Sequence, residues 1–136
     1  MRRYLIVKVL IADDDIEIRA TLRMALEDGG YAVIEAADGA TALAVLESSA
    51  EPLVALLDYR MPEINGTGVV AALADDEGRL QSRHALVLLT AAHAGMLTSA
   101  TAELFPQQPL PVLAKPFDVD ALLQAVADAA RRLPQH

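Results

Sequence analysis

The chain has 136 residues, 54% of them hydrophobic and 22% charged, which fits one globular domain with its own core. Its 11 basic and 19 acidic residues give a formal net charge of −8, and the basic residues form no stripe with aromatic side chains between them, so we expect no direct binding to nucleic acid. Cysteine is absent, which excludes disulfides and thiolate metal sites. No apolar stretch near the start is long enough for a signal peptide or a membrane span, and we therefore expect a soluble, cytoplasmic protein without membrane contact.

Short apolar runs alternate along the chain with segments of helical periodicity. This alternation is typical of an α/β protein built from βα units, with a parallel sheet covered by helices on both faces. The predicted strands are Lys8–Ala12, Ala32–Ala36, Leu53–Asp58, Ala85–Thr90 and Pro111–Ala114.

Apolar residues at helical spacing predict a helix after most of these strands. Asp15, Asp38 and Asp118 each precede such a segment and are expected to be N-caps, and Gly29 is expected to end the first helix. The last helix should end near Arg132. Residues 75–83 read as a polar loop, and the proline-rich residues 106–111 as an extended path into the last strand. The remaining helices are predicted at 39–48, 66–75 and 95–105.

Polar residues stand at or just after the ends of four of the apolar runs. Because the carboxyl ends of parallel strands lie along one edge of a sheet, we expect these residues to converge in one crevice. The acids at the end of the first run, taken alone, are better explained as a cluster that caps a helix. Together with a further acid, a hydroxyl and an ammonium, they predict a site for a divalent cation and a phosphoryl group. The residues are Asp13, Asp14, Asp15, Asp58, Thr90 and Lys115.

Adjacent carboxylates raise one another's pKa unless a cation lies between them. Mg²⁺ prefers oxygen ligands and often uses one or two carboxylates together with phosphate oxygens and water. We expect Asp14 and Asp58 to be carboxylate ligands and Asp13 to hold a metal-bound water. Asp58 beside Mg²⁺ can act as a nucleophile toward phosphorus, with Lys115 offsetting charge and Thr90 donating a hydrogen bond to a phosphoryl oxygen.

These residues resemble the receiver domain of two-component response regulators over nearly the whole chain. The resemblance implies a flavodoxin-like (βα)5 three-layer sandwich with a five-stranded parallel sheet in the order 2-1-3-4-5. We expect residues 1–136 to form a single receiver domain with no output domain in this chain, because 136 residues leave no room for a second folded domain and the last helix should end near Arg132. Whether the protein acts alone or is cut from a longer regulator stays open. The matching pieces are Asp13-Asp14, Asp58–Pro62, Asn65-Gly66, Thr90-Ala91 and Lys115–Phe117.

The resemblance further implies that Asp58 accepts a phosphoryl group from the phosphohistidine of a histidine kinase in a Mg²⁺-dependent reaction. Such a domain is a phosphoacceptor for signalling and catalyses only its own phosphorylation and dephosphorylation. Thr90 and Lys115 would contact the phosphoryl oxygens. The implied Mg²⁺ ligands are Asp13, Asp14, Asp58 and the backbone carbonyl of Arg60.

The expected partners are a histidine kinase or phosphotransfer protein, and a downstream protein or separate output domain. A phosphorylation-dependent homodimer is one way in which the signal would be passed on. Receivers commonly carry an aromatic residue three positions before the lysine, where this chain has Val112, and the interval between threonine and lysine is longer here. We therefore expect an unusual surface around the fourth helix, fifth strand and fifth helix, with partly exposed Met96, Phe105 and Leu110.

Three other functions are considered. A Mg²⁺-dependent phosphohydrolase with an aspartyl-phosphate intermediate would want a second acid two residues after the nucleophile, where Arg60 stands. A flavin-binding module would want phosphate-binding amides at the end of the first strand, where three aspartates would repel the phosphate. A pseudo-receiver that acts by constitutive interaction is indicated by Val112.

The histidines show no spacing that predicts a zinc site. His84 and His93 flank the fourth strand, and His136 ends the chain. All three are expected to lie on the surface.

Overall fold

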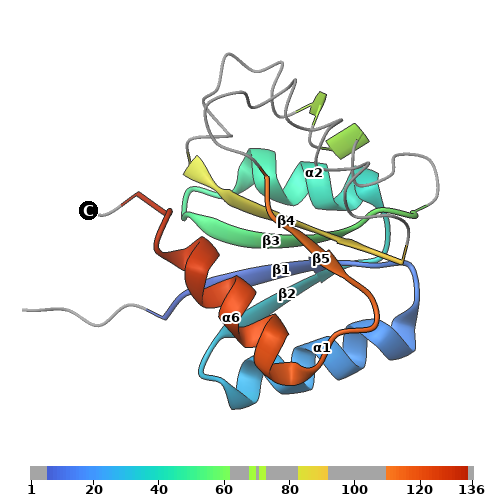
Figure 1. Ribbon diagram of the computed structural model, residues 1–136. Coiled ribbons are helices and arrows are strands. Elements are labelled where there is room, and N and C mark those ends of the chain that lie inside the picture. Colours follow the sequence, from blue (N-terminus) through green and yellow to red (C-terminus); the bar gives the residue numbers. More distant parts are fainter. Residues whose placement is uncertain (1–5, 62–67, 70, 73–82, 92–109, 135–136) are drawn as a thin grey trace, which may run out of the picture.

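The computed structural model describes residues 6–61, 68–69, 71–72, 83–91 and 110–134. In this part of the chain five parallel strands form one sheet in the order β2-β1-β3-β4-β5, with helices on both faces (Figure 1). This is the predicted flavodoxin-like fold class and strand order. The strands are β1 (Lys8–Ala12), β2 (Ala32–Ala36), β3 (Leu53–Asp58), β4 (Ala85–Thr90) and β5 (Val112–Ala114).

The first four strands have the predicted bounds, and the last begins one residue later than predicted. Pro111 accepts a hydrogen bond from the Leu88 amide through its carbonyl, at 3.0 Å. It has no N–H of its own to give to the ladder, which explains why regular pairing begins at Val112.

The helices with described bounds are α1 (Ile16–Asp28), α2 (Gly39–Ser48) and α6 (Val119–Ala130). The three predicted N-caps are confirmed: the carboxylates of Asp15, Asp38 and Asp118 each accept hydrogen bonds from amides in the first turn. Helix α1 ends before Gly29 as predicted. The chain then reverses at Gly30, whose φ of +94° is a conformation that favours glycine.

Side chains alternate between the two faces of the sheet, as a strand requires. On β3, Val54 and Leu56 face α1 and α6, while Leu53, Ala55 and Leu57 face α2. Figure 1 shows α2 on one side of the sheet and α1 and α6 on the other. Both central strands, β3 and β4, are buried along their whole length, which explains why their sequences read as unbroken apolar runs.

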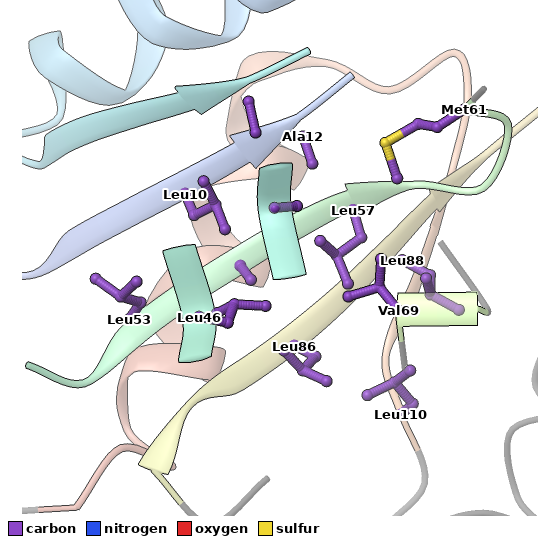
Figure 2. Packing of buried hydrophobic residues seen from close by; sticks show 13 residues of the cluster. Leu10, Ala12, Leu46, Leu53, Leu57, Met61, Val69, Leu86, Leu88 and Leu110 are labelled. Carbon is purple, nitrogen blue, oxygen red and sulfur yellow. The ribbon is translucent and has the colours of Figure 1, made fainter. Parts of the chain in front are cut away.

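The prediction that Leu110 is partly exposed is wrong, because the residue belongs to the core on the α2 side of the sheet. It is 7% exposed and packs in the same cluster as Leu86 and Val69 (Figure 2). The pairing of β5 with β4 brings Leu110, two residues before β5, over this apolar layer. Met96 and Phe105 lie outside the described residues.

Other predictions fall wholly or partly outside the described residues. Of the helix predicted at 66–75, residues 68, 69, 71 and 72 are described and are helical. The helix predicted at 95–105 is not described. Of the loop predicted at 75–83, only Arg83 is described, and it is helical rather than part of a loop. Among the described residues, no helix has the length and apolar character needed to cross a membrane.

Candidate functional site

The sheet brings the predicted site residues to neighbouring strand ends. Asp58 closes β3 and pairs in register with Leu89 of β4. Asp13 directly follows β1, which lies on the other side of β3. Lys115 follows β5, and its amide donates a hydrogen bond of 2.7 Å to the carbonyl of Thr90 at the end of β4.

Three carboxylates meet at this edge. Asp13, Asp14 and Asp58 each offer an oxygen, and these oxygens all lie within 4.8 Å of one another. Within the described part of the chain, no other group of three or more acids, histidines or cysteines gathers in this way. Asp13 and Asp58 are buried at 1% and 7% exposure, whereas Asp14 is exposed, so the cluster is open to solvent on one side.

Lys115 is the cation of the cluster. Its Nζ lies 3.1 Å from Oδ1 of Asp58 and 3.5 Å from Oδ2 of Asp13. The peptide bond from Lys115 to Pro116 is cis. One ammonium thus contacts two of the three carboxylates, and the cluster keeps an excess of acidic groups.

This imbalance bears on the pKa of Asp58. Burial raises the pKa of its carboxyl above the ordinary value, the hydrogen bond from Lys115 lowers that pKa, and the negative charge of Asp13 raises it again. A divalent cation among the three acids would relieve both the repulsion and the burial of unpaired charge. Clustered carboxylate oxygens are the donor set that suits Mg²⁺, so the residues present fit this metal.

Asp15 does not belong to the cluster. Its carboxylate accepts hydrogen bonds from the amides of Glu17 and Ile18 at 2.9 and 3.3 Å, which is the capping role predicted for it. Its amide donates to Oδ1 of Asp13 at 2.9 Å. The cap of α1 and the orientation of the Asp13 carboxylate are therefore set by the same tight turn.

Thr90 and Arg60 occupy the places expected from the sequence. Thr90 is 1% exposed at the end of β4, between the strand that ends in Asp58 and the strand before Lys115. Arg60 follows β3 by two residues and its side chain is exposed. The hydroxyl of Thr90 as a phosphoryl ligand and the carbonyl of Arg60 as a metal ligand stay predictions.

Arg19 touches the site although no motif indicated it. Its Nη1 donates a hydrogen bond of 2.7 Å to the backbone carbonyl of Asp13. Its Nε donates to Oε1 of Glu35 on β2, at 3.1 Å. A charged residue on an amphipathic helix is normally a solvated one, so the sequence carries no signal for these contacts.

The prediction that His84 lies on the surface is wrong. The side chain lies at the start of β4 and the residue is 5% exposed. Its Nδ1 accepts a hydrogen bond from the Leu53 amide at 3.0 Å, and its Nε2 donates to the Leu46 carbonyl at 2.8 Å. Both ring nitrogens are used by backbone groups, which is why the ring can be buried. Burial lowers the pKa of His84 and keeps the imidazole neutral; His93 and His136 lie outside the described residues.

Comparisons with known proteins agree with this geometry. The family model described as response regulator receiver domain matches residues 9–127. The chain is 34% identical to the transcriptional regulatory protein CpxR of Escherichia coli K12 over 125 residues, which are 92% of this chain and 50% of the relative. It is 38% identical to the probable transcriptional regulator ycf27 of Cyanophora paradoxa over 84 residues, 62% of this chain and 33% of the relative. The chain therefore spans half or less of these curated relatives.

Solved structures match over more of their length. The chemotaxis protein CheY4 of Vibrio cholerae superposes with a TM-score of 0.77 at 28% identity, covering 92% of this chain and 99% of that one. The receiver domain of the Francisella response regulator 1452 gives a TM-score of 0.75 at 26% identity, covering 93% of this chain and 98% of that one.

Proposed function

This chain belongs to the response regulator receiver domain family, and from that membership we propose that Asp58 accepts a phosphoryl group and that the chain relays the signal by protein–protein contact. Receiver domains are signalling domains rather than conventional enzymes, and they bind Mg²⁺ at an acidic pocket. The observation that carries the proposal is the contact of Lys115 with Asp58 inside a cluster of three acids.

In the proposed reaction, a carboxylate oxygen of Asp58 forms a bond to phosphorus. The bond from phosphorus to the donor's imidazole nitrogen breaks, and that nitrogen keeps the electron pair. Asp58 suits this role because it is largely shielded from water and because Lys115 holds its Oδ1 at 3.1 Å. That contact fixes the direction of the carboxylate and places a positive charge beside the group being transferred.

The residues around Asp58 are proposed to bind the metal and the phosphoryl group. Mg²⁺, when bound, would neutralise negative charge on the acids and on the phosphoryl oxygens. We propose that Asp13, Asp14 and Asp58 hold it together with the carbonyl of Arg60. The hydroxyl of Thr90 is proposed to donate to a phosphoryl oxygen.

The proposed donor is a histidine kinase or a phosphotransfer protein, and the proposed setting is the cytoplasm. Relatives such as CpxR are transcriptional regulatory proteins, and this chain covers 50% of that relative's length. Any output of that kind is proposed to lie in a separate domain or a partner protein, without direct contact of the receiver with nucleic acid. A phosphorylation-dependent homodimer is part of the same proposal.

The test is incubation with acetyl phosphate and Mg²⁺, followed by intact-mass measurement of a hydroxylamine-labile adduct. We expect the adduct on the wild type and none on Asp58→Asn. Asp28→Asn is a matched control, because Asp28 is an exposed aspartate in the last turn of α1, and it should be labelled like the wild type. Equal labelling of Asp58→Asn and the wild type would refute the assignment of Asp58.

A pseudo-receiver remains a second candidate because of Val112. This residue stands where receivers commonly carry an aromatic side chain, and here it packs half-buried against the cluster on the α2 side of the sheet. A side chain of that kind has no aromatic ring to turn inward on phosphorylation. With beryllofluoride as a phosphoryl mimic, amide shifts at Val112 and Leu113 support a working switch, and shifts absent from β5 support constitutive interaction.

A further inference from the structure

The turn that carries Asp13 and Asp14 is fixed by residues outside the acid cluster. Asp13 donates its amide to the carbonyl of Ala36 on β2 at 3.2 Å. Its carbonyl accepts the hydrogen bond from Nη1 of Arg19, and the same guanidinium is bound by Glu35. Both backbone groups of Asp13 are thus tied to neighbouring elements.

We propose that Arg19 is a positioning residue for the metal-binding acids, which fixes the backbone of Asp13 while Glu35 holds the guanidinium. This inference rests on the proposed function, since it concerns how the same site binds Mg²⁺. Arg19 does not contact the metal or the phosphoryl group in this role. It acts through the orientation of Asp13 and, through the adjoining peptide, of Asp14.

The surroundings of Arg19 suit a fixed side chain better than a solvated one. Its side chain is 13% exposed, compared with 42% for Arg23 one turn further along α1. Glu35 lies beside both, with Oε1 3.1 Å from Nε of Arg19 and Oε2 2.6 Å from Nη1 of Arg23. The two arginines lower the pKa of Glu35, with the hydrogen bond from Arg23 as the largest cause, so Glu35 is an anion at neutral pH and restrains both.

The crowding of the acids explains why a fixed backbone at Asp13 matters for Mg²⁺ binding. Carboxylates within 4.8 Å of one another repel and, without a restraint, would separate. Water entering the space left by a truncated Arg19 could still hydrogen bond to the Asp13 carbonyl. It would not connect that carbonyl to Glu35 and β2, and the acids would have to be ordered when the metal binds.

The direction in which Mg²⁺ affinity changes when Arg19 is removed distinguishes a positioning role from a purely electrostatic one. Arg19 is a positive charge near a cation site, so its removal should tighten Mg²⁺ binding if only charge matters. Loss of positioning should instead weaken binding. Outer-shell partners of metal ligands typically change affinity by 10–100-fold when they are removed, and we expect a loss of roughly tenfold for Arg19→Ala.

Arg23→Ala is the matched control. This substitution also removes one positive charge from α1 and one hydrogen bond to Glu35. It leaves in place the hydrogen bond to the Asp13 carbonyl, which comes from Arg19. We expect its dissociation constant for Mg²⁺ to stay within about twofold of the wild-type value, which is small beside the tenfold scale of an outer-shell ligand partner. Glu35→Gln, which loses the anion that holds Arg19, should weaken binding by less than Arg19→Ala does.

The experiment is calorimetric titration of chelator-treated protein with Mg²⁺, with circular dichroism to verify that each variant is folded. If Arg19→Ala does not fold, Arg19→Lys carries the test. It keeps the charge, so an electrostatic role predicts unchanged binding, whereas positioning predicts weaker binding because lysine lacks the planar fork.

The outcomes distinguish this inference from the proposed function. A wild type that binds no Mg²⁺ and gains no adduct on Asp58 overturns both. A wild type that binds Mg²⁺, with Arg19→Ala or the substituting Arg19→Lys unchanged or tighter, overturns only the role of Arg19. Equal weakening by Arg23→Ala overturns it as well, and weakening confined to Arg19 and Glu35 variants supports it.

Discussion

The two ends of β3 bury polar groups in opposite ways. At the start of the strand, the Leu53 amide and the Leu46 carbonyl both bond to the neutral ring of His84. At its end, Asp58 lies with two further acids and one lysine. The first arrangement satisfies every ring nitrogen without charge and should stabilise the fold. The second leaves negative charge unbalanced, which costs stability and favours the binding of a cation.

The largest change in stability is expected at the start of β3, where both ring nitrogens of His84 are hydrogen bonded. His84→Ala leaves a buried N–H and a buried C=O without the ring, and each such group costs about 1–3 kcal/mol. The free energy of unfolding should fall by about 2–6 kcal/mol in urea titrations. Glu51→Ala is the control, because it removes an exposed ion pair with Lys8 and should cost about 0–1 kcal/mol. A His84→Ala variant as stable as that control would remove the contrast between the two ends.

A substitution at the charged end should have the opposite sign. Asp58→Asn removes one of the crowded negative charges, so the metal-free protein should become more stable by on the order of 1 kcal/mol at neutral pH. Chemical denaturation in the presence of a chelator measures this. Added Mg²⁺ should stabilise the wild type more than the variant, and a destabilised Asp58→Asn in chelator would contradict the account.

The pH dependence of the free energy of unfolding should carry a contribution from His84 and another from Asp58. Burial lowers the pKa of His84 below its ordinary 6.5, so the unfolded chain binds its proton more readily and stability should be lost as the pH falls below about 6.5. The slope in this range should be flatter in His84→Ala. An equal slope in both proteins would mean that His84 is not the group responsible.

Asp58 should give a slope of the other sign. Burial raises its pKa above the ordinary 3.8, so the folded chain holds this proton more tightly than the unfolded chain does. Its contribution to stability should therefore decrease as the pH rises from about 3.8 through the raised pKa. Comparing metal-free wild type with Asp58→Asn across this range isolates the effect, and parallel curves would count against it.

The strand ends could be predicted from the sequence because the topology decides their neighbours. Lys115 lies 57 positions from Asp58 in the sequence, yet both follow apolar runs, and parallel strands bring such residues to one edge. The caps at Asp15 and Asp118 are local and equally readable. The strand order itself came from the family resemblance and not from the apolar runs.

Contacts made by single side chains across the fold could not be predicted in the same way. His84 meets partners 31 and 38 positions away, and Arg19 meets Glu35 across 16 positions. Nothing in the local pattern distinguishes these side chains from solvated ones. The burial of Leu110 could not be predicted for a related reason, since it depends on where β5 joins the sheet.

Asp13, Asp14, Asp58 and Lys115 are proposed to form one site for Mg²⁺ and a phosphoryl group. The decisive measurement is amide NMR of the wild type during titration with beryllofluoride, with and without Mg²⁺. We expect saturable shifts at residues 13, 14, 58 and 115 that require Mg²⁺ and disappear in Asp58→Asn. Shifts that need no Mg²⁺, that survive in Asp58→Asn, or that fall elsewhere in the chain would contradict it.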